Sequence, residues 1–326
     1  MSPAPKSNAW QPAAALKELQ LRADILKHIR TFFATREVLE VETPLMCRTS
    51  VTDPFIESVP ALYQFHSQTV AEQFYLQTSP EYAMKRLLAA GSGSIFQICK
   101  AFRQAENGCL HNPEFTMLEW YRIGFNHLHL MDEVDALLIE ILQTTASDKI
   151  TYAELFASQL DIDVHIDSLE TLHNVAKHNH IHITDDIYDR DTWLSLLLTH
   201  CIEPTLGSDR PCIIYDFPVS QAALARANAD GKTAARFEVY YRGMELANGF
   251  HELQDATEQR RRFIENNKKR SSLQLNEMPI DENFLSALQA GLPDCAGVAL
   301  GVDRLIMLAS GKHFIQDVMS FDISRV

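Results

Sequence analysis

The sequence is short of positive charge. Its 326 residues carry 29 Lys and Arg against 43 Asp and Glu, a formal net charge of −14. An acidic surface repels phosphate backbones, so no broad nucleic-acid-binding face is expected. Glycine and proline are few, at 12 and 13, while hydrophobic residues reach 46%. This composition is typical of a globular protein and excludes wholesale disorder.

Paired cysteines and long apolar runs are also missing. The six cysteines are scattered without a CxxC pair, so we expect neither a zinc ribbon nor a disulfide framework, but a reduced, cytoplasmic setting. No apolar run approaches the roughly 20 residues of a membrane span. Because residues 1–14 contain one lysine, early prolines and no apolar core, we expect neither a signal peptide nor a membrane anchor.

The order of periodic segments predicts a chain that mixes helices and strands. Residues 1–15 are expected to be a flexible arm, and residues 127–235 a helical or mixed insertion. Apolar residues recur every three or four positions over 16–36, which predicts an amphipathic helix. The remaining expected elements are a short strand before Pro44, a helix at 80–90, a hairpin at 94–122, a β-rich run at 237–253, helices at 255–270 and 281–290, and a strand and helix at 297–310.

The hairpin at 94–122 carries the most chemistry. Alternation along a strand places Cys99 and Arg103 on one face of its first strand, and Phe115, Glu119 and Tyr121 on one face of its second. If the two faces coincide, one surface offers groups that hold a phosphate, stack on an adenine and capture an ammonium. An ordinary half-buried hairpin with surface charges explains the pattern equally well.

The last strand is lopsided. Gly297, Ala299 and Gly301 leave a flat shelf on one side, against which a ligand could lie, although a glycine-rich strand packed tightly against another element has the same pattern. We expect Asp303 to cap the following helix, with Arg304 in its first turn. A cation there opposes the helix dipole, so an anion is expected nearby.

Two glutamates in MELANGFHEL (244–253) suit a cation. Glu245 and Glu252 are seven residues apart, which places them on opposite faces of a regular strand. The pair Asn248-Gly249 predicts a turn or bulge that re-aims the second. Two converging carboxylates bind Mg²⁺ readily beside nucleotide phosphates; taken alone, such a pair is more often at the surface.

In this order the segments resemble the catalytic domain of a class II aminoacyl-tRNA synthetase of the lysyl type. VETPLM (41–46) resembles motif 1, FRQAENGCLHNPEFTMLEWY (102–121) motif 2, and GVALGVDRL (297–305) motif 3. The resemblance extends from about residue 16 to residue 326. It implies one catalytic domain over 16–326 with an α+β fold, in which an antiparallel sheet is flanked by helices. It also implies a homodimer joined through motif 1.

The resemblance also implies roles for individual residues. Catalysis would rest on Arg103, Glu245, Glu252 and Arg304, and Glu245 and Glu252 would bring Mg²⁺. ATP would be bound by Arg103, Gln104, Ala105, His111, Asn112, Phe115, Glu245, Leu246, Gly301 and Arg304. The amino-acid substrate would contact Ser79, Pro80, Glu81, Glu119, Tyr121, Asn248, Glu252 and Ala299, with carboxylates at both ends, which suits a diamino acid.

Two departures separate the chain from lysyl-tRNA synthetases. The motif 1 helix begins near residue 16, which leaves no room for an anticodon-binding domain, so anticodon recognition is not expected. Ala299 stands where those enzymes have glycine, and a methyl-scale change in a pocket is worth about 1–3 kcal/mol of discrimination. In both respects the chain is similar to the elongation factor P (R)-β-lysine ligase family.

That similarity implies activation of (R)-β-lysine with ATP and transfer to a lysine side chain of elongation factor P. A truncated lysyl-tRNA synthetase that makes lysyl-adenylate or lysyl-tRNA, and a catalytically silent paralogue that serves as a regulator, are the alternatives. One position departs from the family: Ala105 stands where motif 2 has an acidic residue, and Glu106 follows it. Either Glu106 or backbone groups of Gln104 and Ala105 would then recognise adenine.

Overall fold

A computed structural model describes residues 10–66, 69–181 and 189–326. The fold class is the predicted one, a mixed α and β structure with a large, mostly antiparallel sheet flanked by helices. The chain divides into two compact units. The first comprises residues 1–121, 254–293 and 299–326, and the second comprises residues 122–253 and 294–298. The expected arm at 1–15 lies largely outside the described residues.

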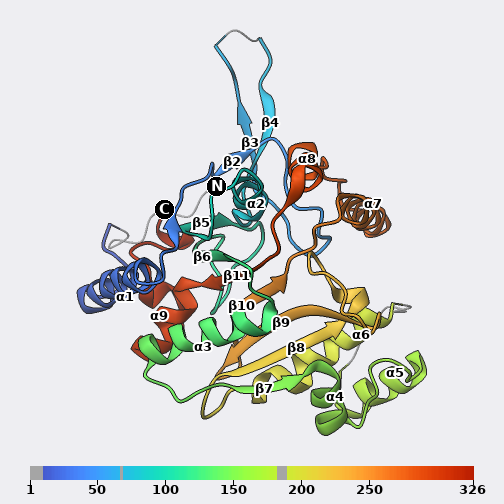
Figure 1. Cartoon of the computed structure of the whole chain (residues 1–326). Coiled ribbons are helices and arrows are strands. Elements are labelled where there is room, and N and C mark those ends of the chain that lie inside the picture. The colour runs from blue at the N-terminus through green and yellow to red at the C-terminus, as the bar shows by residue number, and fades with distance from the viewer. Residues whose placement is uncertain (1–9, 67–68, 182–188) are drawn as a thin grey trace, which may run out of the picture. The chain divides into compact units, whose positions relative to one another are not determined.

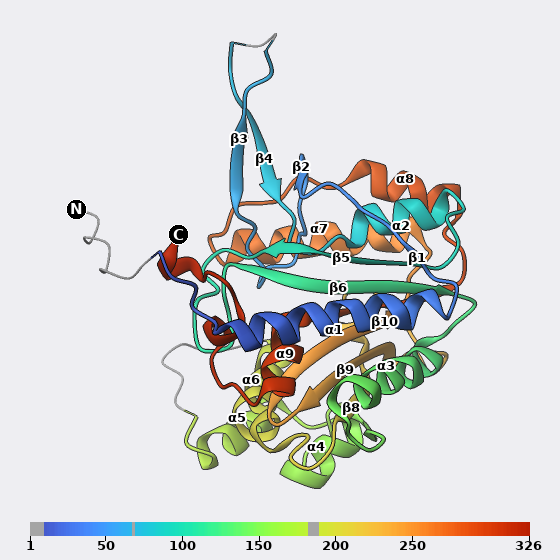
Figure 2. The ribbon, with the colours of Figure 1, turned by 90° about the vertical axis from the view of Figure 1, so that its left-hand side faces the viewer.

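The first unit contains the segments that resemble motifs 1 and 2, and the segment that resembles motif 3 from Ala299 onward (Figures 1 and 2). Its helices are α1 (Leu16–Ala34), α2 (Glu81–Ala89), α7 (Ala256–Ser272), α8 (Glu282–Gly291) and α9 (Val302–Ser310). Its strands are β1 (Leu39–Glu40), β2 (Met46–Cys47), β3 (Pro60–Tyr63), β4 (Glu72–Leu76), β5 (Ile95–Phe102) and most of β6 (Glu114–Ile123). β1 pairs parallel to β5, and β2, β4 and β3 form a separate small sheet.

The predicted hairpin is confirmed as β5 and β6. Their antiparallel register pairs Gln97 with Glu119, Cys99 with Met117 and Ala101 with Phe115, so the two expected faces do coincide. α1 covers the other face, where Phe33 stacks on Phe96 with ring centroids 4.5 Å apart. The face of the hairpin that carries Phe96 thus packs into the core, whereas the face that carries Phe115 and Glu119 is left for other contacts.

The predicted cap of the last helix is wrong. α9 begins at Val302 after an extended Gly301, and no side chain caps it. Asp303 lies inside the first turn and is 2% exposed. Its carboxylate accepts hydrogen bonds from Arg22 of α1 (2.6 Å) and from the Thr116 amide of β6 (2.6 Å). A long-range ion pair has therefore replaced the local cap, which sequence spacing does not reveal.

The second unit is built on the hairpin of β9 (Thr233–Tyr241) and β10 (Met244–His251). In this unit β9 also pairs with β8 (Cys212–Pro218), which pairs parallel to β7 (Asp148–Thr151). α3 (His127–Leu142) packs on β9 and β10, and α4 (Tyr152–Leu160) packs on β7 and β8 (Figure 1). α5 (Leu169–His178) and α6 (Arg190–Leu197) complete the core around α4. β11 (Cys295–Gly301) begins in this unit and ends in the first.

The interruption predicted at Asn248-Gly249 lies elsewhere. Asn248 and Gly249 are regularly paired with Glu238 and Phe237, whereas the register shifts between Glu245 and Ala247. The extra residue is Leu246, which is 2% exposed. A bulge at a buried apolar residue carries no turn chemistry that the sequence could display.

Candidate active site

Arg103 lies at the end of β5 next to an aromatic ring. Its guanidinium carbon is 5.1 Å from the centroid of the Phe115 ring, and Nη1 is 3.5 Å from Oε1 of Glu106. The Arg103 amide donates to the Pro113 carbonyl (2.9 Å), which continues the strand ladder by one residue. A cation over a ring face is stabilised by the ring's quadrupole. The first unit therefore brings Arg103 and Phe115 together as the spacing predicted.

His111 and Arg304 form a second group. Arg304 Nη2 is 2.7 Å from His111 Nε2, so the arginine donates to a neutral imidazole nitrogen. Burial lowers the pKa of His111, and the positive charge of Arg304 lowers it further. Gly301 precedes α9, and a side chain there would be in ordinary contact with Arg304. The segments that resemble motif 2 and motif 3 are thus joined by a hydrogen bond between His111 and Arg304.

Asn112 and the motif 2 loop are held by backbone contacts. Asn112 is 5% exposed, donates from Nδ2 to the Glu114 carbonyl (2.6 Å) and accepts at Oδ1 from the Ile323 amide (3.0 Å). The Gln104 amide donates to the Glu57 carbonyl (2.8 Å). Ala105 has a φ of +64°, a left-handed conformation that L-residues rarely adopt. Adenine recognition was expected either from Glu106 or from the backbone of Gln104 and Ala105. Of these, Glu106 forms an ion pair with Arg103.

Glu119 and Tyr121 face the same side of β6. The Tyr121 hydroxyl donates to Oε1 of Glu119 at 2.6 Å, and both side chains are 2% exposed. The nearby thiol of Cys99 has its pKa raised to about 12, first by burial and then by the charge of Glu119. The two residues therefore form a buried, hydrogen-bonded acidic pair next to an uncharged thiol.

Ser79, Pro80 and Glu81 form the start of α2. The Ser79 hydroxyl accepts weakly from the Glu81 amide (3.4 Å), and Glu81 Oε1 lies 2.7 Å from Lys85 Nζ. The segment adjoins the hairpin, because Gln77 accepts from the Phe102 amide and donates to the Lys100 carbonyl. All three predicted residues are thus placed beside β5 within the first unit.

Glu245 and Asn248 lie on one face of the second unit's hairpin. The bulge at Leu246 makes Glu245 oppose Tyr240 and Asn248 oppose Glu238, and Tyr240 and Glu238 share one face of β9. Asn248 Nδ2 donates to Glu238 (3.2 Å), as does the Tyr240 hydroxyl (2.6 Å). Glu252 follows β10 and is 1% exposed. Of the predicted residues, Asn248 is thus bound to a carboxylate, Glu238, that the sequence pattern had not singled out and that also pairs with Arg236.

In the part of β11 that belongs to the first unit, small and large side chains alternate between the two sides as predicted. Ala299 and Gly301 are half-buried, whereas Leu300 and Val302 are fully enclosed. The side with small residues is therefore the more accessible one.

Sequence reasoning missed Glu238 and Lys85. Glu238 is seven residues before Glu245, and only the bulge brings the two to one face. Lys85 is four residues after Glu81, a spacing that does signal a helical ion pair. The first could not be found without the register, while the second was available in the sequence.

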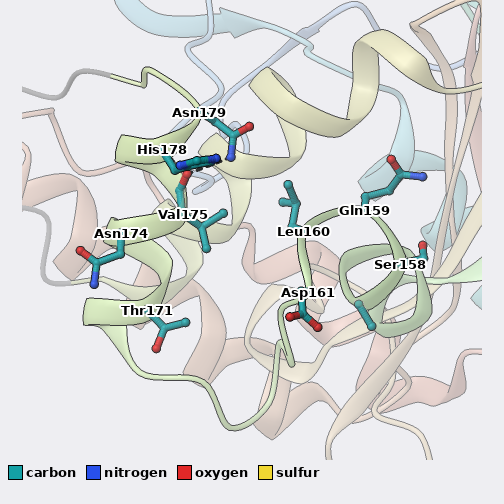
Figure 3. A pocket seen from close by; sticks show the side chains of 10 residues that line it. Ser158, Gln159, Leu160, Asp161, Thr171, Asn174, Val175, His178 and Asn179 are labelled. Atoms are coloured by element: carbon teal, nitrogen blue, oxygen red, sulfur yellow. Dashed lines mark hydrogen bonds between the residues drawn. The ribbon is translucent and has the colours of Figure 1, made fainter.

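One hollow of the second unit is lined by none of these residues. It has a volume of about 770 Å³ and is bordered by the end of α4 and by α5 (Figure 3). Its lining includes Gln159, Asp161, Asn174 and His178, and none of the predicted site residues. Within the described residues, no group of three or more His, Cys, Asp or Glu side chains is arranged to hold a metal ion.

Two further expectations concern the chain as a whole. All six cysteines are free thiols, as predicted. Among the described residues, no helix combines the length and the apolarity that crossing a bilayer would require.

Comparison with known proteins gives a consistent result. Residues 10–325 match the family of class II tRNA synthetases (D, K and N). A protein of Vibrio atlanticus named elongation factor P–(R)-β-lysine ligase is 50% identical over 320 residues, covering 98% of this chain and 99% of the relative. Proteins of the same name from Salmonella gallinarum and Salmonella typhimurium are each 51% identical over 322 residues, covering 97% of this chain and 98% of each relative.

Proposed function

Because the chain belongs to the class II tRNA synthetase family, and within it to the elongation factor P–(R)-β-lysine ligases, we propose that it activates (R)-β-lysine with ATP. The products are β-lysyl-adenylate and pyrophosphate, and the acyl group then passes to a lysine ε-amine of elongation factor P. The observation that carries the proposal is the face of the β5–β6 hairpin, where Arg103 and Phe115 adjoin Glu119 and Tyr121.

ATP is bound in this proposal mainly by side chains of the first unit. Arg103 holds the α-phosphate and the substrate carboxylate, and stabilises the charge that develops when the carboxylate attacks. Phe115 stacks on the adenine, while His111 and Arg304 hold the distal phosphates. The neutral state of His111 supports this role, because it accepts from Arg304 and leaves the arginine charge for the nucleotide. Gln104, Ala105, Asn112 and Gly301 shape the surrounding loop and shelf.

Mg²⁺ is held in this proposal by carboxylates of the second unit. Glu245 and Glu252, which were expected from the sequence, are the two ligands. Glu238 lies on the Glu245 face but pairs with Arg236 and accepts from Tyr240 and Asn248, so it supports that face without being a third ligand. Oxygen-only donors of this kind fit Mg²⁺, which takes one or two carboxylates together with substrate phosphates. When bound, the ion neutralises phosphate charge. Leu246 provides the bulge on which the shared face depends.

The diamino acid meets carboxylates at both ends. Glu119, with the Tyr121 hydroxyl on one oxygen, receives the side-chain ammonium, and Glu81 at the start of α2 receives the second amino group. Ser79 and Pro80 set the start of that helix, and Asn248 and Glu252 are the further substrate contacts that the family resemblance implies. Ala299 replaces a glycine on the shelf and shifts the preference from α-lysine to β-lysine.

The acceptor and the assembly complete the proposal. Elongation factor P is the acceptor, as in the relatives' name, and the enzyme works in the cytoplasm without anticodon recognition. We also propose a homodimer joined near motif 1, where Leu39, Leu45 and Met46 are 55%, 40% and 36% exposed. Three exposed apolar side chains within eight residues of sequence support an interface in this segment. Light scattering on the purified protein measures this state.

Acyl transfer is tested by intact mass. Elongation factor P is incubated with the enzyme, ATP, Mg²⁺ and (R)-β-lysine, and a single addition of one β-lysyl group is expected. A variant of elongation factor P with its acceptor lysine replaced by arginine is the control. If the factor gains no mass while tRNA becomes charged with α-lysine, the chain is a truncated lysyl-tRNA synthetase instead.

A further inference from the structure

Lys85 is a buried cation that the proposed chemistry does not use. It lies in α2, its side chain is 1% exposed, and its ammonium is 2.7 Å from Oε1 of Glu81. Burying an ammonium costs several kcal/mol unless a carboxylate and good geometry offset it. A lysine kept in such a place is therefore held by specific neighbours.

Those neighbours fix both ends of the pair. Phe284 of α8 lies under the ammonium, 5.8 Å from its ring centroid, and is itself fully buried. Tyr82 stacks on the same ring with centroids 4.6 Å apart. α8 thereby holds the Lys85 ammonium in place, and the ammonium is a fixed, charge-assisted partner for the Glu81 carboxylate.

Glu81 is the less buried partner. Its side chain is 13% exposed, against 1% for Lys85, so the carboxylate lies nearer the surface than the ammonium that it pairs with. Lys85 approaches Oε1, and Oε2 is the second acceptor of the carboxylate. A glutamate followed by lysine four residues later is also the favourable order on a helix.

We propose that Lys85 is a positioning residue, which holds the Glu81 carboxylate in the orientation that receives the second amino group of the diamino acid substrate. This inference rests on the proposed function, since Glu81 has that role only if the chain activates a diamino acid. Lys85 itself does not touch the substrate.

The test compares two ligands in wild type and in Lys85→Met. Methionine fills the space of lysine without its charge. The ligands are (R)-β-lysine and 6-aminohexanoate, which keeps the carboxylate and the terminal ammonium but lacks the second amino group. Isothermal titration calorimetry gives both dissociation constants. For Lys85→Met we expect weakening of about tenfold for (R)-β-lysine and less than about twofold for 6-aminohexanoate, since one charged hydrogen bond is misplaced.

Controls separate positioning from stability. Lys100→Met removes an exposed pair with Glu114 (3.3 Å) in the same unit and should change neither constant. Glu81→Gln should lose the same discrimination between (R)-β-lysine and 6-aminohexanoate. The double variant with Glu81→Gln and Lys85→Met should lose no more affinity for (R)-β-lysine than either single variant. Lys85→Gln keeps a donor toward Glu81 and should restore part of the affinity; it also replaces Lys85→Met if that variant does not fold.

Either of two results would overturn the inference. Equal weakening for both ligands would make Lys85 a purely structural residue, and no weakening at all would leave Glu81 independent of it. A wild-type protein that binds both ligands equally well would refute the proposed amino-group pocket itself. That result is read before any variant is made, so the two failures are distinguishable.

Discussion

The hairpins β5–β6 and β9–β10 carry most of the proposed chemistry, and they differ in how regular they are. β5 and β6 pair without interruption over eight residue pairs, so simple alternation places Phe115 and Glu119 correctly. β9 and β10 contain a bulge at Leu246, which decides that Glu245 and Asn248 share a face. A regular hairpin can therefore be interpreted from its sequence, while an irregular one needs its register.

The regular hairpin gives the prediction with the largest effect. Arg103→Ala should lower ATP–pyrophosphate exchange by about 100- to 1,000-fold, the usual loss when a charge-stabilising donor is removed. Lys100→Ala, on the opposite face of the same strand, should stay near wild type, because its pair with Glu114 is exposed. Comparable losses in both variants would show that the face of β5 does not matter.

The irregular hairpin gives the second prediction. Glu238→Gln should raise the Mg²⁺ concentration needed for half-maximal exchange by about 10- to 100-fold, since Glu238 accepts from Tyr240 and Asn248 and so orients the face on which Glu245 lies. Glu203 also accepts from the Tyr240 hydroxyl (3.1 Å) but lies outside the hairpin. Glu203→Gln is therefore the matched control and should leave the Mg²⁺ requirement unchanged. An unaltered requirement in Glu238→Gln would separate Glu238 from the metal.

A smaller effect is expected at the substrate end of β6. Tyr121→Phe removes a hydroxyl that donates to Glu119 at 2.6 Å. A hydrogen bond to a charged group contributes about 1.5–3 kcal/mol, so the KM for (R)-β-lysine should rise about tenfold or more. The KM for ATP should not move, because Phe115 and Arg103 are untouched. A rise in the KM for ATP alone would reassign Tyr121 to the nucleotide.

The smallest effect concerns the thiol of Cys99, whose pKa depends on burial and on the neighbouring charge of Glu119. With a pKa of about 12, roughly one thiol in ten thousand is ionised at pH 8. Iodoacetamide at pH 8 should therefore modify the exposed Cys109 and leave Cys99 unmodified, as peptide mass spectrometry would show. Raising the pH increases the thiolate fraction, so labelling of Cys99 should increase. Rapid labelling at pH 8 would contradict the partly buried position of Cys99 next to Glu119.

The sequence predicted elements whose cause is local. α1, α2, the β5–β6 hairpin and α9 follow from periodicity and lie close to their expected bounds. Three features arise from contacts between distant residues and were not predictable in this way. These are the ion pair of Asp303 with Arg22, the bulge at buried Leu246, and the arrival of Glu238 beside Asn248. Tertiary contacts override local preference in each case.

Substrate choice in the activation step tests the central claim most directly. ATP–pyrophosphate exchange is measured with (R)-β-lysine, (S)-β-lysine and α-lysine at equal concentrations. We predict that (R)-β-lysine supports the fastest exchange and that exchange stops when Mg²⁺ is chelated. Preference for α-lysine would contradict the account and favour a truncated lysyl-tRNA synthetase, and no exchange with any of the three would point to a catalytically silent paralogue.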